Sequence, residues 1–170
     1  MLTSALVNVP ANDTTPVPAP AGTVVRHRGE HASVRRTAAE IAKCLRADFK
    51  AAIADKGLPA MKFSITSERY SMGQSVTVRV TAAPFGVLNP ERVRFDEATR
   101  YMRSSDLSRY TPRAMQILAR LEAIAAEYVR SETESASDYC NTNCHMDIGF
   151  AGALENAERA AILAQSSATR

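Results

Sequence analysis

The chain has 170 residues, of which 45% are hydrophobic and 23% are charged, and this composition is typical of one soluble globular domain. Its 21 Lys and Arg residues against 18 Asp and Glu residues give a formal net charge of +3. Length and charge therefore exclude two large domains, and they exclude the strong cationic excess of a protein that coats nucleic acid.

The first 30 residues are predicted to form a flexible tail. Residues 12–22 read NDTTPVPAPAG, with three prolines, and such composition buries little apolar surface. The start lacks a basic region followed by an apolar stretch, and no run approaches the ~18 apolar residues of a membrane span. Three cysteines cannot all pair within one chain. We therefore expect a cytoplasmic protein that has no membrane partner.

A helix and a β-hairpin are predicted to follow the tail. Thr37 and Glu40 have the spacing of a capping box, and an apolar stripe of helical period continues to about Lys56. Gly57 and Pro59 end this helix. Apolar and polar residues then alternate over 61–66 and again over 76–81, which predicts two strands joined by a short loop.

The second half of the chain predicts two more helices and a strand. Asn89-Pro90 and Thr111-Pro112 are cap-plus-proline pairs, which open helices at about 90–102 and 111–130. Residues 131–138 (SETESASD) are expected to form a polar acidic loop, and the alternation within 139–150 predicts a third strand. Residues 155–165 have weak helical character, and residues 166–170 are expected to fray.

These elements predict one α+β domain over residues 31–165. Its order is helix, β-hairpin, helix, helix and strand, with a three-stranded antiparallel sheet and a weak C-terminal helix. The apolar stripe of helix 111–130 would serve a single core or a two-fold interface equally well. The oligomeric state, a dimer included, therefore stays open.

Catalytic motifs are missing from the sequence. It contains no G-x-x-x-x-G-K-[ST] phosphate loop, no G-x-G-x-x-G, no G-x-S-x-G and no H-E-x-x-H, and it has only three histidines as general-base candidates. We therefore expect a protein that is not an enzyme and that needs no cofactor.

The cysteines and histidines allow one alternative to this view. Cys140, Cys144 and His145, with His27 and His31, offer the donor types of a tetrahedral zinc site or a thiol-dependent enzyme. The segment between the cysteines has no glycine to stiffen a metal-binding turn, and neighbours on a strand point to opposite faces. We favour Cys144 as a core residue and Cys140 as a loop thiol.

Charge is distributed unevenly along the chain. Residues 26–50 hold seven cations against three carboxylates, whereas residues 120–160 hold three cations against eight carboxylates. Arginine suits phosphate or carboxylate partners, and the alternative is a solvated helix face with local ion pairs. The candidate binding residues are Arg35, Arg36, Arg46, Lys50, Lys62 and Arg79.

Two segments resemble a known domain family. The run TAAEIAKCLRADFKAAIADKGLPAMKFSITSERYSMGQSVTVRV, residues 37–80, resembles the helix and hairpin of the large polyvalent protein-associated domains, where AxxIRxxLKxxFP leads into KFSV and a V-x-V strand. Residues 128–150 resemble the family's second half. This chain departs from the family where Arg79 and Ala82-Ala83 replace a tryptophan and an Asp-Gly, and where Cys140 and Cys144 replace aromatic residues.

The resemblance implies a phage or conjugative-element origin and no established active site. With the polarised charge, it leads us to expect a non-catalytic protein that engages a host protein complex and inhibits a nucleic-acid-targeting defence system of the anti-CRISPR or anti-restriction type. The alternative is an accessory protein of a mobile element that binds nucleic acid directly, with an affinity that falls steeply as salt rises.

Overall fold

The computed structural model describes residues 24–71, 73–134 and 139–168 of the chain. The elements follow in the order β1 (Val24–Arg28), a 3-10 helix (Glu30–Ser33), α1 (Ala38–Ala54), β2 (Lys62–Tyr70), β3 (Gly73–Ala82), α2 (Pro90–Thr99), α3 (Pro112–Ala126), β4 (Arg130–Glu134), β5 (Tyr139–Thr142), β6 (His145–Phe150) and α4 (Gly152–Ala168). The predicted α+β class is confirmed, and so is the predicted order from α1 to α3.

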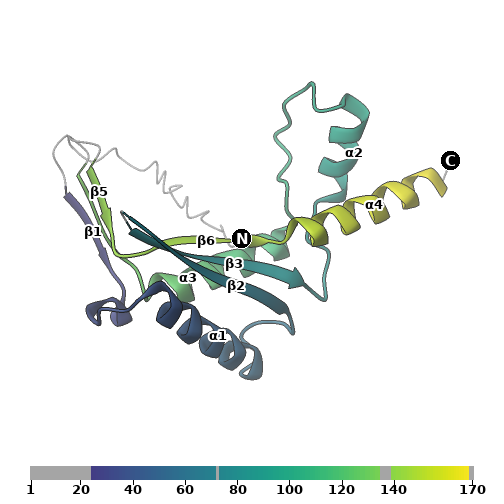
Figure 1. Cartoon of the computed structure of the whole chain (residues 1–170). Helices are drawn as coiled ribbons and strands as arrows, with labels where there is room; N and C mark the ends of the chain where they lie inside the picture. The colour runs from purple at the N-terminus through teal and green to yellow at the C-terminus, as the bar shows by residue number, and fades with distance from the viewer. Residues whose placement is uncertain (1–23, 72, 135–138, 169–170) are drawn as a thin grey trace, which may run out of the picture.

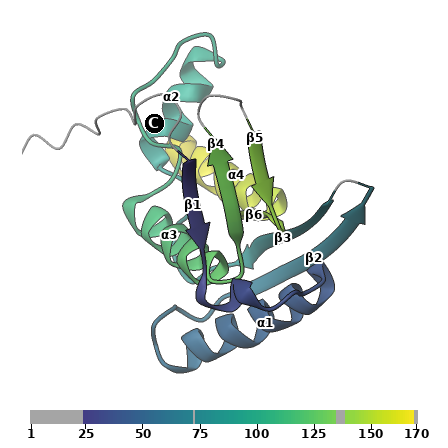
Figure 2. The same ribbon diagram turned by 90° about the vertical axis from the view of Figure 1, so that its left-hand side faces the viewer.

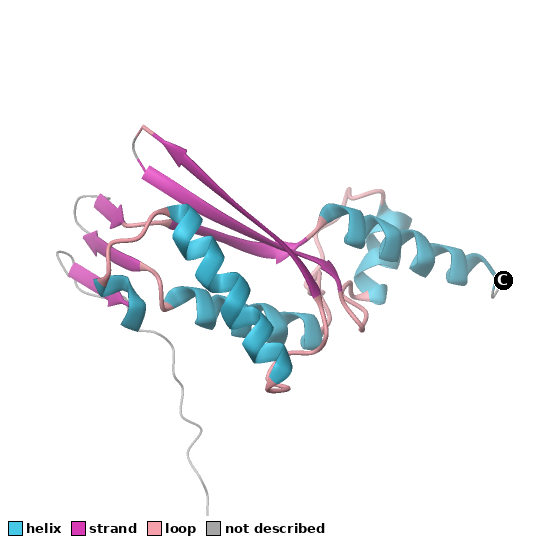
Figure 3. Ribbon diagram, turned by 60° about the horizontal axis from the view of Figure 1, so that its bottom comes forward, coloured by secondary structure: helices cyan, strands magenta, loops and turns pink. Residues whose placement is uncertain are grey.

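The main sheet has the strand order β2-β3-β6, and α1 and α3 cover one of its faces (Figures 1 and 3). Val76, Val78 and Val80 of the central strand point toward these helices and are fully buried, as are Leu45 and Leu121 from the helices. The alternate residues of β3 point to the other face, as the two-residue period of a strand requires. This sheet and the two helices form the main apolar core.

The third strand of this sheet runs parallel to its neighbour, so the sheet is mixed and not antiparallel throughout as predicted. β6 pairs with β3 from Ser75 opposite His145 to Val80 opposite Phe150. The chain between these strands includes α2, α3 and two further strands, and such a long crossover returns it to the end of the sheet where β3 began. An alternating pattern predicts a strand but carries no information on its direction.

A second sheet, with the order β1-β4-β5, was not predicted (Figure 2). Residues 24–28, assigned to the tail, form β1, and residues 130–134, assigned to the end of the helix and the acidic loop, form β4. The predicted strand 139–150 is two strands, β5 and β6, which belong to different sheets. β1 and β4 pair across more than 100 residues, as with Arg26 opposite Glu132, so no local pattern reveals this pairing.

The chain ends in α4, which packs on α2 beyond one end of the main sheet (Figure 1). This helix is longer than the weak helix predicted for residues 155–165, and it includes residues 166–168, which were expected to fray. Residues 1–23 of the predicted tail lie outside the described residues, as do 169–170.

Candidate interaction surface

The basic residues of α1 lie on one flank of the helix. Lys43, Arg46 and Lys50 are spaced at i, i+3 and i+7, which places them on the same side. Of the two carboxylates of the helix, Asp48 lies on the opposite flank, where it accepts a hydrogen bond of 2.5 Å from the Tyr128 hydroxyl. Glu40 lies next to Lys43 at i−3, and it completes the capping box with Thr37. This flank of α1 is therefore mainly cationic.

Three predicted binding residues gather where this flank meets β2, an edge strand. A guanidinium nitrogen of Arg46 donates to the backbone oxygen of Ile65. The rings of Phe49 and Phe63 are 5.0 Å apart, which brings residue 50 level with the start of β2 at Lys62. Lys50 and Lys62 are exposed, and neither forms a hydrogen bond or ion pair with another described residue.

Arg36 is held by other groups near the start of α1. Its Nη1 donates to the His31 carbonyl at 2.6 Å, and its guanidinium lies 5.6 Å from the centroid of the Tyr128 ring. Burial of Tyr128, together with its bond to Asp48, raises the pKa of this phenol well above its ordinary value, so it stays a neutral donor. Arg35 is exposed and has no such contact within the described part of the chain.

Arg79 lies on the opposite side of the main sheet from α1. It donates to both carboxylate oxygens of Asp147 on β6, to Oδ1 at 3.0 Å. The hydrogen bond from Arg79 lowers the pKa of Asp147, so the carboxylate stays charged. Arg79 therefore has an anionic partner and lies apart from the cations near α1. The six predicted residues thus form three separate groups and not one site, namely Arg35 with Arg36, Arg46 with Lys50 and Lys62, and Arg79 alone.

The cysteine and histidine candidates do not converge. Cys144 is buried in the core, where burial raises the pKa of its thiol and disfavours the thiolate. His145 is exposed and packs against Tyr70, with 6.5 Å between the ring centroids. Cys140 belongs to β5, but its side chain lies outside the described residues. Nε2 of His27 lies 3.1 Å from the Ala126 carbonyl, and no cluster of three metal-ligating side chains occurs among the residues that the structure describes.

The loop between α2 and α3, residues 100–109, presents exposed apolar side chains that sequence reasoning missed. Met102 is 86% exposed and Tyr101 is 60% exposed, and Leu107 is also exposed. Arg100 and Tyr101 have positive φ angles of 48° and 61°, a left-handed conformation that costs a non-glycine residue of order 1–3 kcal/mol. This conformation turns the chain sharply at the end of α2.

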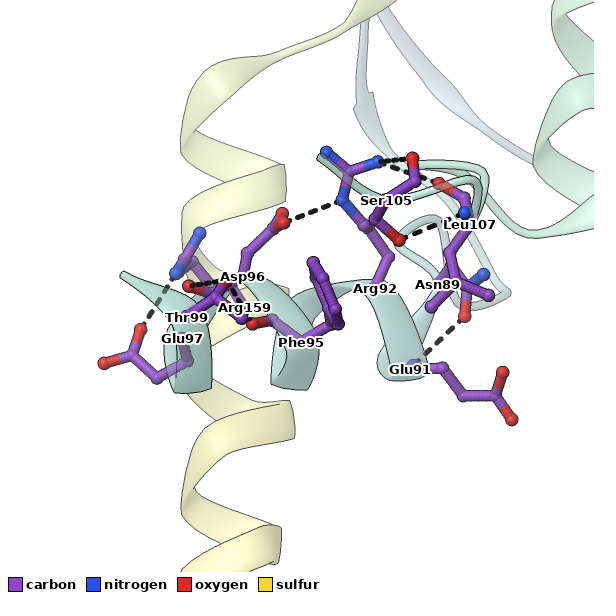
Figure 4. A network of polar contacts seen from close by, with 10 residues as sticks. All are labelled: Asn89, Glu91, Arg92, Phe95, Asp96, Glu97, Thr99, Ser105, Leu107 and Arg159. Atoms are coloured by element: carbon purple, nitrogen blue, oxygen red, sulfur yellow. Dashed lines mark hydrogen bonds and ion pairs between the residues drawn. The ribbon is translucent and has the colours of Figure 1, made fainter. Parts of the chain in front are cut away.

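A polar network fixes the base of this loop (Figure 4). Arg92 donates to Asp96 at 2.8 Å and to the Leu107 carbonyl at 2.8 Å, so it ties α2 to the far end of the loop. Arg159 of α4 donates to Glu97 at 2.9 Å, and its guanidinium lies 5.0 Å from the centroid of the Tyr101 ring. The loop is thus braced from two helices, which compensates for the strained backbone.

The loop gave only weak signals in the sequence. The sequence of residues 104–110 is typical of a polar link. A left-handed backbone at an arginine and a tyrosine cannot be predicted either, because only glycine and asparagine commonly indicate this conformation. Met102 was assigned to the end of the predicted helix 90–102, but α2 ends at Thr99, so the exposure of Met102 in the loop was not predicted.

Comparison with known proteins identifies the family of the chain. No helix in the described part of the chain is both long and apolar enough to cross a membrane. Neither the curated proteins nor the solved structures include a match to this chain. Residues 36–146, from the start of α1 to the start of β6, match the family described as Large polyvalent protein associated domain 29. The match covers well over half of the sequence and includes the cationic flank of α1 and the apolar loop, and the chain therefore belongs to this family.

Proposed function

We propose that this is a non-catalytic protein of a phage or other mobile element, that it engages a host protein complex in the host cytoplasm, and that it inhibits a nucleic-acid-targeting defence system of the anti-CRISPR or anti-restriction type. Family membership supports the mobile-element setting. The missing catalytic motifs support a binding role. The observation that carries the proposal is the braced apolar loop between α2 and α3.

The loop has the composition and rigidity of a protein-binding element. Aromatic residues, methionine and arginine are enriched at protein interfaces, and Tyr101, Met102 and Arg103 stand consecutively at its tip. Arg100 and Arg103 are exposed and form no ion pair with a described residue. Because Arg92 already holds the loop backbone at the Leu107 carbonyl and Arg159 already packs on the Tyr101 ring, binding would order few further groups.

The test is capture of a host complex by the full chain and by two matched variants. Tyr101→Ser with Met102→Ser should reduce the captured complex at least tenfold, since loss of a central interface anchor typically costs more than 1.4 kcal/mol. Val34→Ser, which changes another exposed apolar residue far from the loop, should capture as much as the wild type. Nuclease treatment should leave the complex bound. Equal capture by the loop variant would exclude the loop as the binding element.

Direct nucleic-acid binding is the second candidate, and the one-sided charge of α1 favours it. Lys43, Arg46 and Lys50 present three cations on one flank, and the neighbouring Glu40 is already bonded to Thr37. This function predicts an affinity for a DNA or RNA duplex that falls steeply with salt, and a shallower salt slope for Lys43→Gln with Lys50→Gln. An affinity that does not change with salt would remove this candidate.

A further inference from the structure

A hollow with cationic walls lies between the end of α1 and α3. Its volume is about 460 Å³, which is within the range of small-molecule sites, roughly 300–1,000 Å³. The charged side chains that line it are Lys56, Arg113 and Arg120, and apolar groups of Leu58 and Ile117 line it between them. None of these residues was a candidate in the sequence, because they come from two segments more than 50 residues apart.

None of the three cations has an anionic partner in the described part of the chain. No carboxylate lines the hollow, and none of the three side chains takes part in a hydrogen bond or an ion pair there. Arg113 and Arg120 are seven residues apart on one face of α3, with Ile117 between them. The Arg120 guanidinium lies above Gly57, where an added methyl group would be 3.5 Å from its Nη2 atom. The positive charge is therefore concentrated around one opening.

Two of these cations occupy positions that cost stability. Lys56 has a φ of 57°, although the next residue is Gly57, which would adopt this left-handed conformation freely. Arg113 lies in the first turn of α3, which holds no acidic residue, and the helix dipole disfavours a cation there. Its guanidinium packs over the Phe85 ring, 5.0 Å from the centroid. The left-handed Lys56 closes the end of α1, where its amide donates to the Ile53 carbonyl, and the Phe85 ring holds Arg113. Neither contact neutralises the positive charge at the hollow, whereas an anionic ligand would.

We infer that this hollow binds a small organic phosphate of nucleotide size. The phosphate group would lie among the two guanidinium groups and the ammonium group, which supply charge-assisted hydrogen bonds. The half-buried Ile53 and Pro59 also line the hollow, and their apolar surface would contact the body of the ligand. This site lies on α1 and α3 and does not depend on the α2–α3 loop or on its partner.

Calorimetric titration of the full chain with ADP, with inorganic pyrophosphate and with a 12-base-pair DNA duplex tests the inference. We expect ADP to bind, and Arg113→Gln with Arg120→Gln to weaken ADP at least tenfold. Arg103→Gln removes an exposed arginine of the α2–α3 loop and should leave ADP binding unchanged. No heat with ADP or pyrophosphate at millimolar concentration, or equal ADP affinity in the double variant, would overturn the inference.

The other titrations and one further variant identify the class of phosphate ligand and test the role of Lys56 in its left-handed conformation. If pyrophosphate binds as tightly as ADP, the apolar surface does not contribute to binding. If ADP does not bind and the DNA duplex binds only when Arg113 and Arg120 are present, the site belongs to nucleic acid instead. Lys56→Gly should weaken ADP binding and also raise the melting temperature by about 1–4 °C, because glycine relieves the left-handed backbone. A variant that lost stability and kept its ADP affinity would contradict this account of Lys56.

Discussion

The two ends of the molecule are stabilised in different ways. The main sheet, α1 and α3 share a large apolar core, which includes fully buried leucines, valines and Phe49. The lobe formed by α2 and α4 has a separate, smaller core, in which Leu88, Val93 and Ile162 are buried and Tyr110 and Leu163 pack against them. Polar contacts hold this lobe, among them the bonds from the backbone of Val87 and Leu88 to Glu158 of α4.

This difference indicates how the protein divides stability and binding. Burial of apolar area contributes most of the free energy of folding, so the main core should unfold only globally. A lobe that depends on a few charged hydrogen bonds should open at a lower free energy. The exposed loop that we propose as the binding element belongs to the weaker lobe, so changes in the lobe should affect binding before they affect the fold.

The largest expected effect is in the main core. Leu45→Ala removes a fully buried side chain of α1 that packs under the main sheet, and such truncations cost about 2–5 kcal/mol of unfolding free energy. Chemical denaturation followed by circular dichroism measures this loss. A cost below about 1 kcal/mol would mean that the core is loosely packed and that the contrast with the lobe is wrong.

The next effect should be confined to the lobe. Glu158 accepts from the Val87 amide at 2.7 and 2.9 Å and from the Leu88 amide at 3.2 Å, and Glu158→Gln removes the charge and one acceptor. A hydrogen bond to a charged group contributes about 1.5–3 kcal/mol, so the α2 amides should exchange their hydrogens faster by one to two orders of magnitude.

Two comparisons decide whether this effect is local. The amides of α1 and β3 should keep their exchange rates in the Glu158→Gln variant, and Glu122→Gln, on the exposed side of α3, should alter neither region. If α1 and β3 exchanged faster together with α2, the two ends would form a single cooperative unit.

The parts of the fold that sequence could predict are those with local signals. The Thr37 capping box, the cap-plus-proline pairs before α2 and α3, and the period-two pattern of the hairpin all depend on residues a few positions apart. Each of these elements begins close to where it was expected, although α2 and α3 end at Thr99 and Ala126, before the predicted ends at 102 and 130. β1 and β4 pair over more than 100 residues and carry polar side chains, and the parallel direction of β6 depends on the whole crossover. Such features need tertiary information.

The candidate sites were harder to predict, because sequence shows charge but not its partners. Arg79 and Lys62 look alike in a list of cations, yet Arg79 is paired with Asp147 and Lys62 has no partner among the described residues. The cationic hollow combines Lys56 with Arg113 and Arg120, residues that only the packing of α1 on α3 brings together.

A smaller effect is expected in the second sheet, which lies on the other side of the main sheet from the lobe of α2 and α4 (Figure 1). Arg26 forms an ion pair with Glu132, but the next pair on the same face sets Arg28 directly opposite Arg130. Like charges in this position are destabilising, so Arg130→Glu should increase the unfolding free energy by about 0.2–1 kcal/mol. Thermal unfolding measures the gain. A loss of stability would show that Arg130 has an attractive contact that outweighs its repulsion from Arg28.

The smallest effect should come from an exposed ion pair in the main sheet, where apolar burial dominates. The hydrogen bond from Arg79 lowers the pKa of Asp147 below its ordinary value of 3.8, so the charged form is favoured in the folded state. The resulting stabilisation is complete above pH 3.8 and is lost as the pH falls through the lower, folded-state pKa.

Asp147 is largely exposed, and solvent screens the pair, so the unfolding free energy of Asp147→Asn should differ only slightly from that of the wild type at pH 7. The difference in unfolding free energy between the two proteins, measured by denaturation from pH 7 to pH 2, should shrink toward zero in acid. A difference that stayed constant below pH 3 would mean that the carboxylate acts through its shape and not its charge. A large difference at pH 7 would mean that polar contacts stabilise the main sheet as much as they stabilise the lobe.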